Sequence, residues 1–142
     1  MVLELNMAKA RELVELAIEE KGPKYVYVNS YERTSGVCSY VHDIHGVDPE
    51  PGCIVGHALI LGGLDVEDFT DINEVSATAA LDALWDRGLV HTSGAVCFYL
   101  DTLQMNQDAG IAWGEANEKA LEGYVWDTDN NPKGQWVKRG EL

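Results

Sequence analysis

The segment from Cys53 to Leu61 constrains the fold more than any other part of the chain, because it is apolar on nearly every side. A helix without a polar face must be covered all round, whereas an ordinary surface helix buries only one stripe. Gly62 and Gly63 directly follow the segment and are typical helix-ending residues. We therefore predict a short central helix at 53–61, in which Gly56 lets another backbone approach closely.

Four other helices are predicted from apolar residues that recur at spacings of three and four. Asn6 begins the first of them, and Gly22 with Pro23 ends it. The limits predicted for the others are Asn73 or Ser76 to Gly88, Thr92 or Ser93 to Gly110, and Ala112 to Glu122. Asp65 is predicted to cap a shorter helical turn at 66–72.

A β-hairpin is predicted near residues 25–41. Its two arms, Tyr25–Val28 and Val37–Val41, are rich in the β-branched and aromatic residues that favour strands. The segment that follows, 43–52, contains Gly46, Pro49 and Pro51. We therefore predict a loop without regular structure there.

The C-terminal segment allows two interpretations. Residues 124–126 and 135–137 flank a polar loop, so they form either a second hairpin or a disordered tail. With 142 residues and 46% apolar composition, the chain has the size of one domain with an ordinary core. The predicted fold is therefore α+β: a mainly helical single domain over residues 1–142, with a β-hairpin near 25–41 and a C-terminal hairpin as the open alternative.

The charge of the chain argues against one class of partner. The sequence has 10 basic and 24 acidic residues, a formal net charge of -14, and Arg87 is the only basic residue between Thr34 and Glu118. Such a field repels phosphate backbones and anionic lipid surfaces, and it attracts basic proteins, metal ions and polyamines. We therefore predict no binding of nucleic acid or membranes through the chain's own charge.

The segment from Gln104 to Glu115 has the outline of a helix–turn–helix unit. However, no Lys or Arg lies in it to hold phosphates, which argues against reading of DNA. We expect Gln104, Gln107 and Asp108 to hydrogen-bond to neighbouring backbone as structural polar groups instead.

Three features favour a cytoplasmic location. The N-terminal residues lack the pattern of a signal peptide. The longest apolar run, 53–64, is too short to span a bilayer. Three cysteines are too few for the disulfide framework of small secreted domains.

Cysteine and histidine gather in one part of the sequence, where Cys38/His42 and Cys53/His57 repeat the spacing Cys-x3-His. Each pair shares one face, the first of a strand and the second of a helix. If the two pairs converge, they provide four ligands for a tetrahedral zinc ion. The spacing matches no familiar zinc motif, and the same residues also suit ordinary buried positions.

Cys53 has a second potential role as a nucleophile at a helix N-terminus, with His42 or His57 as its base. Apolar and acidic surroundings raise a thiol pKa, which argues against this role. The sequence has no complete catalytic motif.

Four tryptophans and six tyrosines exceed what a core of this size requires. Trp126 and Trp136 lie in the predicted C-terminal hairpin, where little else can be buried. Exposed aromatic residues are common in protein interfaces. We therefore predict an interaction surface at Trp126 and Trp136, most readily for self-association.

The motifs at 52–59 and 104–116, Gly-Cys-Ile-Val-Gly-His-Ala-Leu and Gln-x2-Gln-Asp-x-Gly-x2-Trp-x-Glu-Ala, resemble those of small proteins encoded by actinobacteria and their phages. Cys38-x-Tyr40 and Pro51-Gly52 fit the same pattern, so the resemblance covers roughly Val37 to Leu121. It implies a bacterial host cell or phage setting and no particular activity.

Acidity, surplus aromatics and the lack of a complete catalytic set favour a non-enzymatic binding or interaction protein without a cofactor. In the setting that the resemblance implies, such a protein acts as a phage accessory factor on a host protein. The alternative is a metal-dependent or thiol enzyme, with zinc as its metal, built on Cys38, His42, Cys53 and His57.

Overall fold

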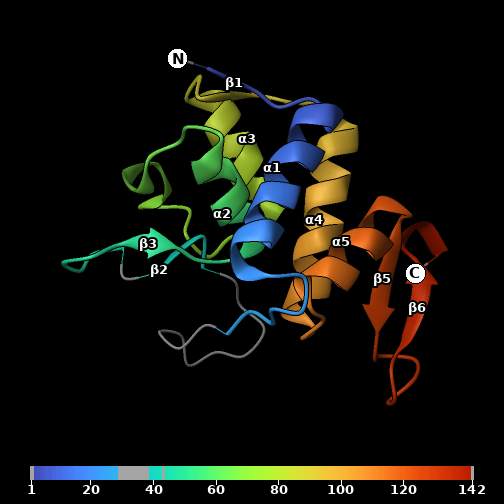
Figure 1. Ribbon diagram of the computed structural model, residues 1–142. Coiled ribbons are helices and arrows are strands. Elements are labelled where there is room, and N and C mark those ends of the chain that lie inside the picture. The colour runs from blue at the N-terminus through green and yellow to red at the C-terminus, as the bar shows by residue number, and fades with distance from the viewer. Residues whose placement is uncertain (1, 29–38, 43, 142) are drawn as a thin grey trace.

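The computed structural model describes residues 2–28, 39–42 and 44–141, and it forms a mainly helical α+β domain (Figure 1). The helices in this part of the chain are α1 (Met7–Lys21), α2 (Ile54–Leu61), α3 (Ala77–Asp86), α4 (Gly94–Asp108), α5 (Trp113–Leu121), and the short 3₁₀ helices η1 (Val66–Phe69) and η2 (Arg139–Glu141). The strands are β1 (Leu3–Glu4), β2 (Val41–His42), β3 (Glu50–Pro51), β4 (Val90–His91), β5 (Tyr124–Asp127) and β6 (Gln135–Lys138).

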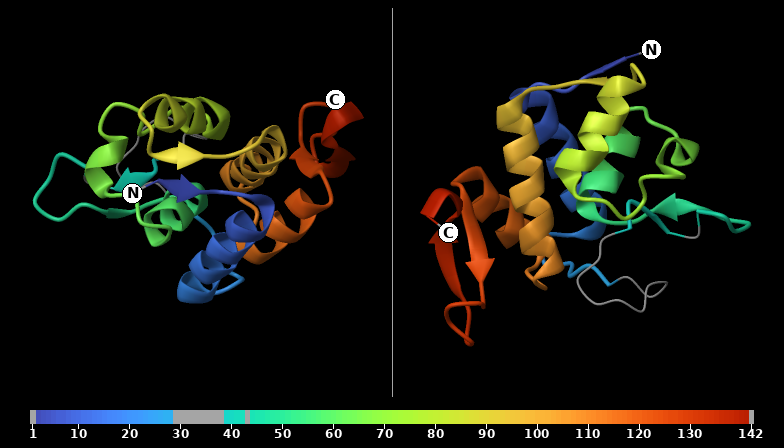
Figure 2. Two further views of the ribbon diagram at one scale, coloured as in Figure 1. Left: turned by 90° about the horizontal axis from the view of Figure 1, so that it is seen from above. Right: turned by 180° about the vertical axis from the view of Figure 1, so that it is seen from behind.

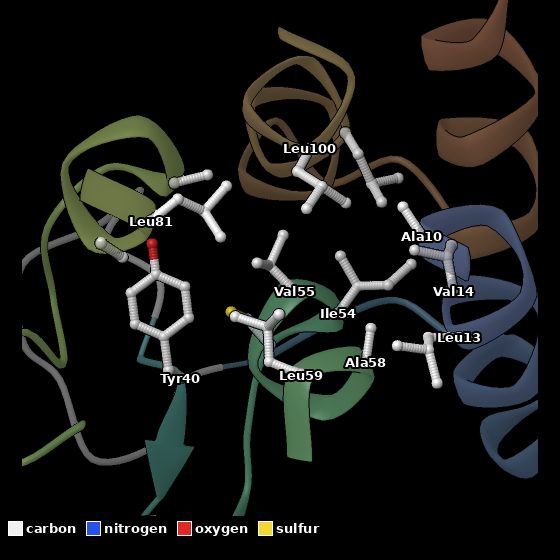
Figure 3. Close-up of a cluster of buried hydrophobic side chains, with 14 of the residues drawn as sticks. Ala10, Leu13, Val14, Tyr40, Ile54, Val55, Ala58, Leu59, Leu81 and Leu100 are labelled. Atoms are coloured by element: carbon white, nitrogen blue, oxygen red, sulfur yellow. The ribbon is translucent and has the colours of Figure 1, made fainter. Parts of the chain in front are cut away.

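The predicted central helix is confirmed. Every residue of α2 from Ile54 to Leu59 is buried. Figure 3 shows how its side chains divide between neighbours: Ala58 points toward α1, while Leu59 lies beside Tyr40. Because α2 has no polar face, α1, α4 and the segment before β2 must together cover it.

The close approach predicted at Gly56 is also confirmed. A Cβ atom built on Gly56 would lie 2.3 Å from the backbone oxygen of Tyr40. This contact seats the backbone next to β2 directly on α2. A side chain of any size at this position would push the two elements apart.

Side-chain caps fix the helix starts that the sequence left open. Ser76 accepts a hydrogen bond from the backbone N–H of Ala79, and Ser93 accepts one from Val96. Asn6 caps α1 as predicted, through the backbone N–H of Lys9. Each cap satisfies an N–H that has no partner inside its helix.

The region of the first predicted hairpin differs from expectation. Tyr25–Val28 are irregular, and residues 29–38 lie outside the described part of the chain. The carbonyl oxygens of Pro23 and Tyr25 accept hydrogen bonds from Gly114 and Trp113 at the start of α5. The backbone before and within Tyr25–Val28 therefore accepts hydrogen bonds from the start of α5. This tertiary contact overrides the strand propensity of these residues.

The prediction of a loop without regular structure at 43–52 is wrong at Glu50–Pro51. These residues form β3, which pairs antiparallel with β2 so that Val41 lies opposite Pro51. The pairing continues past the proline, because the N–H groups of Gly52 and Cys53 donate to Tyr40 and Ser39. A short edge strand tolerates proline, since it needs no hydrogen bond from that position.

The C-terminal segment is a hairpin and not a disordered tail. β5 and β6 pair antiparallel, with Trp126 opposite Trp136. Arg139 fastens the hairpin to α4 through the carboxylate of Asp101 at 2.6 Å and the hydroxyl of Thr102 at 3.0 Å. In Figures 1 and 2 the hairpin lies at one end of the molecule, beyond α5.

The contact at Gly56 predicts the effect of one methyl group. We expect Gly56→Ala to lower the free energy of unfolding by about 2 kcal/mol, because its Cβ meets rigid backbone. Gly94→Ala is the matched control, since nothing lies within 4 Å of its added Cβ. Urea unfolding followed by circular dichroism measures both, and an equal loss in the two variants would contradict the packing argument.

Candidate functional site

His57, from the predicted cysteine–histidine cluster, faces α1. Its Nε2 atom forms a hydrogen bond with the carboxylate of Glu20, and its ring meets Trp113 edge-on at a centroid distance of 6.0 Å. The side chain is only 6% exposed, and its Nδ1 atom has no hydrogen-bond partner in the described part of the chain. His57 therefore joins α1, α2 and α5.

His42 faces a different neighbourhood. Its Nε2 atom lies 2.8 Å from the hydroxyl of Tyr27, and its ring packs so closely on Gly52 that an added Cβ would lie 2.9 Å from it. Burial lowers the pKa of His42. His42 thus contacts Tyr27 and the turn before α2, whereas His57 contacts α1 and α5.

The sulfur of Cys53 is engaged in a disulfide bond, whose partner is not among the described residues. Cys38 also lies outside them. In this oxidised state Cys53 has no thiolate, which a nucleophile or a zinc ligand requires. Disulfides are rare in reducing compartments, so this bond does not favour the predicted cytoplasmic location.

Within residues 2–28, 39–42 and 44–141, no three His, Cys, Asp or Glu side chains form a group that could hold a metal ion. His42 and His57 have different contact partners, and Cys38 lies outside the described residues. A four-ligand zinc site therefore stays a prediction.

The structural role predicted for the glutamines of α4 is confirmed. Gln107 accepts a hydrogen bond from the backbone N–H of Ile54 at 2.7 Å, and Gln104 accepts one from Ala77 at 2.7 Å. These donors are the first residues of α2 and α3. Two side chains three residues apart on α4 thus cap the starts of two other helices, α2 and α3.

Asp108 is a titratable group whose state the sequence did not predict. Burial raises its pKa to about 6, against the effect of the hydrogen bond from Gln107. The neighbouring Tyr27 hydroxyl also has a raised pKa, about 12, mainly because of burial. Sequence position could not show this, because the burial arises from segments distant along the chain.

Trp126 and Trp136, the predicted interaction residues, form a cross-strand pair with a centroid distance of 5.1 Å and an edge-to-face geometry. The Nζ atom of Lys119 lies 5.5 Å from the Trp136 ring centre. Both tryptophans are half-buried, so the pair covers part of the hairpin as well as presenting an aromatic surface.

A groove that the sequence analysis missed lies between α1 and α2. Its volume is about 330 Å³, and Leu16, Glu19, Glu20 and Leu61 line it. Leu16 is 42% exposed and Leu61 is 38% exposed. The sequence did offer one sign of this groove: Leu16 lies outside the apolar stripe of its helix and is surrounded by glutamates.

No family model matches the chain, and no curated protein or solved structure is significantly similar to it. Among the described residues, no helix is both long and apolar enough to cross a membrane.

The raised pKa of Asp108 predicts a pH dependence of stability. Its folded-state pKa exceeds the ordinary value of 3.8, so folding favours the protonated form. Stability is therefore lost as pH rises from about 4 to about 6, and it stays lower above that range.

We expect Asp108→Asn to raise the urea midpoint at pH 7 and to flatten the pH dependence between pH 4 and 6, because an amide needs no proton to be neutral. Asp82→Asn, on the exposed side of α3, is the control. An unchanged pH profile in Asp108→Asn would show that this carboxyl group does not titrate with folding.

Proposed function

We propose that this chain is a non-catalytic protein-binding module, and that the groove between α1 and α2 receives a basic amphipathic segment of a partner protein. The observation that carries the proposal is the pairing of two exposed leucines with two glutamates in one groove. Apolar side chains of the partner would contact Leu16 and Leu61, and its basic side chains would meet Glu19 and Glu20.

The apolar part of the groove comes from two different helices. Leu16 lies in α1, and Leu61 is the last residue of α2. The two side chains lie together only because α1 packs against the central helix. Surface leucines of soluble proteins are usually scattered, whereas a pair that lines one concavity suits an anchor side chain. A helix whose leucines recur every three or four residues fits such a site.

The charge around the groove selects the sign of the partner. Glu12 and Glu15, on the same helix as the groove-lining Glu19 and Glu20, are exposed, although Glu12 also pairs with Lys9 at 3.2 Å. The whole chain carries a formal charge of -14, which accelerates the encounter with a basic segment. An acidic or nucleic-acid partner would meet repulsion at the same place.

His57 holds one wall of the groove in position. Its buried ring bonds to the Glu20 carboxylate from the side of α2, although Glu20 itself remains 54% exposed. Glu20 therefore has a fixed place on the rim and can still face a ligand. In this proposal His57 has a positioning role, which differs from the metal-binding role predicted from the sequence.

The resemblance to actinobacterial and phage proteins suggests the setting of such binding. We extend the proposal to a phage accessory factor whose partner is a host protein with a basic amphipathic segment. The binding chemistry at the groove is independent of this setting and can be tested alone.

The test uses a designed amphipathic helical peptide of leucine and lysine, labelled for fluorescence anisotropy. We expect the double variant Leu16→Ser/Leu61→Ser to bind it at least about tenfold more weakly, because each contact of an exposed leucine is worth roughly 1 kcal/mol. This double variant leaves the charge of the chain unchanged. The same peptide with glutamate in place of lysine should not bind.

Met105→Ser is the matched control, because Met105 is 41% exposed and lies on α4, away from the groove-lining residues. It should bind the peptide like the unmodified chain. Undiminished binding by the groove variant would mean that the peptide adheres through charge alone, and equal weakening in Met105→Ser would mean that the effect is not specific to the groove. Either outcome would refute the groove proposal.

A further inference from the structure

The strand β5 has both of its edges occupied. One edge pairs with β6. At the other edge, the side chain of Asn106 donates to the backbone oxygen of Tyr124 at 3.0 Å and accepts from the N–H of Trp126 at 3.0 Å. The amide group of Asn106 thus takes the place of a neighbouring strand.

At the outer edge of β6, by contrast, no described residue takes the place of a neighbouring strand. Because the N–H of Trp126 points to Asn106, the Trp126–Trp136 pair is the kind that exchanges no backbone hydrogen bonds. The N–H and C=O groups of Trp136 therefore point away from β5, and the same alternation applies to Lys138. Neither N–H has an acceptor in the described part of the chain, and Figure 1 shows β6 on the outer side of the hairpin.

We propose that β6 pairs with β6 of a second copy of this chain, antiparallel and about a two-fold axis at Trp136. In this register the N–H of Trp136 donates to the partner subunit's Trp136, and the N–H of Lys138 donates to the partner subunit's Gly134. Hydrogen-bonding groups that face outward on one edge strand are complementary to those of an identical strand turned by 180°.

Charge identifies a second copy as the occupant. Two chains of formal charge -14 repel each other over most of their surfaces. Residues 119–141 carry no net charge, because their four basic residues balance their four acidic ones: Lys119, Lys133, Lys138 and Arg139 against Glu122, Asp127, Asp129 and Glu141. The hairpin is therefore a part of the surface where two copies approach without net charge repulsion.

The side chains fit the same register. Trp126 and Trp136 lie opposite each other on one face of the hairpin, so the two-fold axis continues them into a row of four tryptophans across four strands. Aromatic cross-strand pairs stabilise sheets. Lys138 lies opposite a glycine and not opposite a second lysine, which avoids a repulsive pair at the centre of the interface.

The experiment is sedimentation equilibrium of the full chain from low-micromolar to millimolar concentration, with Cys97→Ser throughout to exclude disulfide-linked dimers. We expect a reversible dimer. Lys138→Pro removes one outward N–H per copy and leaves the bonds to β5 intact, so it should weaken dimerisation by about tenfold or more. Lys138→Gln loses the same ammonium group but keeps the N–H, and it should dimerise like the parent.

Hydrogen exchange on the chain with native β6 provides a readout that does not depend on the folding of a proline variant. The amides of Trp136 and Lys138 should exchange more slowly as the concentration rises. A monomer at every concentration, a dimer that Lys138→Pro leaves unchanged, or exchange at Trp136 that is independent of concentration would each overturn the proposal. Peptide binding at the α1–α2 groove involves other residues, so the two proposals can fail separately.

Discussion

The structure depends on the burial of a helix that has no polar face. α2 can be placed in the centre only if the N–H groups at its start find acceptors, because an unpaired amide in an apolar interior costs about 1–3 kcal/mol. Gln107 meets part of this requirement by accepting from Ile54. Gln107 lies in α4. From the same helix, Gln104 accepts a hydrogen bond from the first residue of α3, and Asn106 accepts one from Trp126 in β5. α4 therefore links the central helix, its neighbour and the terminal hairpin through three amide side chains within four residues.

Local signals in the sequence predicted much of this fold. The apolar run at 53–61, the cap at Asn6 and the glycine at position 56 each have a physical meaning that does not depend on distant residues. Ser76 and Ser93 were each one of two possible caps, and the structure selects them. The strand predicted at Tyr25–Val28 from residue propensity does not form, because the carbonyl of Tyr25 accepts a hydrogen bond from Trp113 at the start of α5. Such a contact between segments far apart in the chain cannot be deduced from composition.

The candidate sites were harder to predict for the same reason. The four-residue spacing of Cys53 and His57 predicts that they share a helix face. In the folded chain, however, His57 bonds to Glu20 and Cys53 is in a disulfide. Leu16 and Leu61 are separated by forty-five positions, and only the packing of α1 on α2 makes them one groove. For Trp126 and Trp136 the sequence allowed a hairpin or a disordered tail, and only the structure gives the register that places them opposite each other.

The pairing of β1 with β4 has a consequence for the order of folding. Leu3 and Leu5 donate hydrogen bonds to Leu89 and His91, so these parallel strands close a loop of more than eighty residues. Closure of so long a loop costs entropy before any contact repays it. During synthesis, the segment before α1 therefore waits for its partner until about two thirds of the chain has left the ribosome, whereas α1 and α2 can already associate.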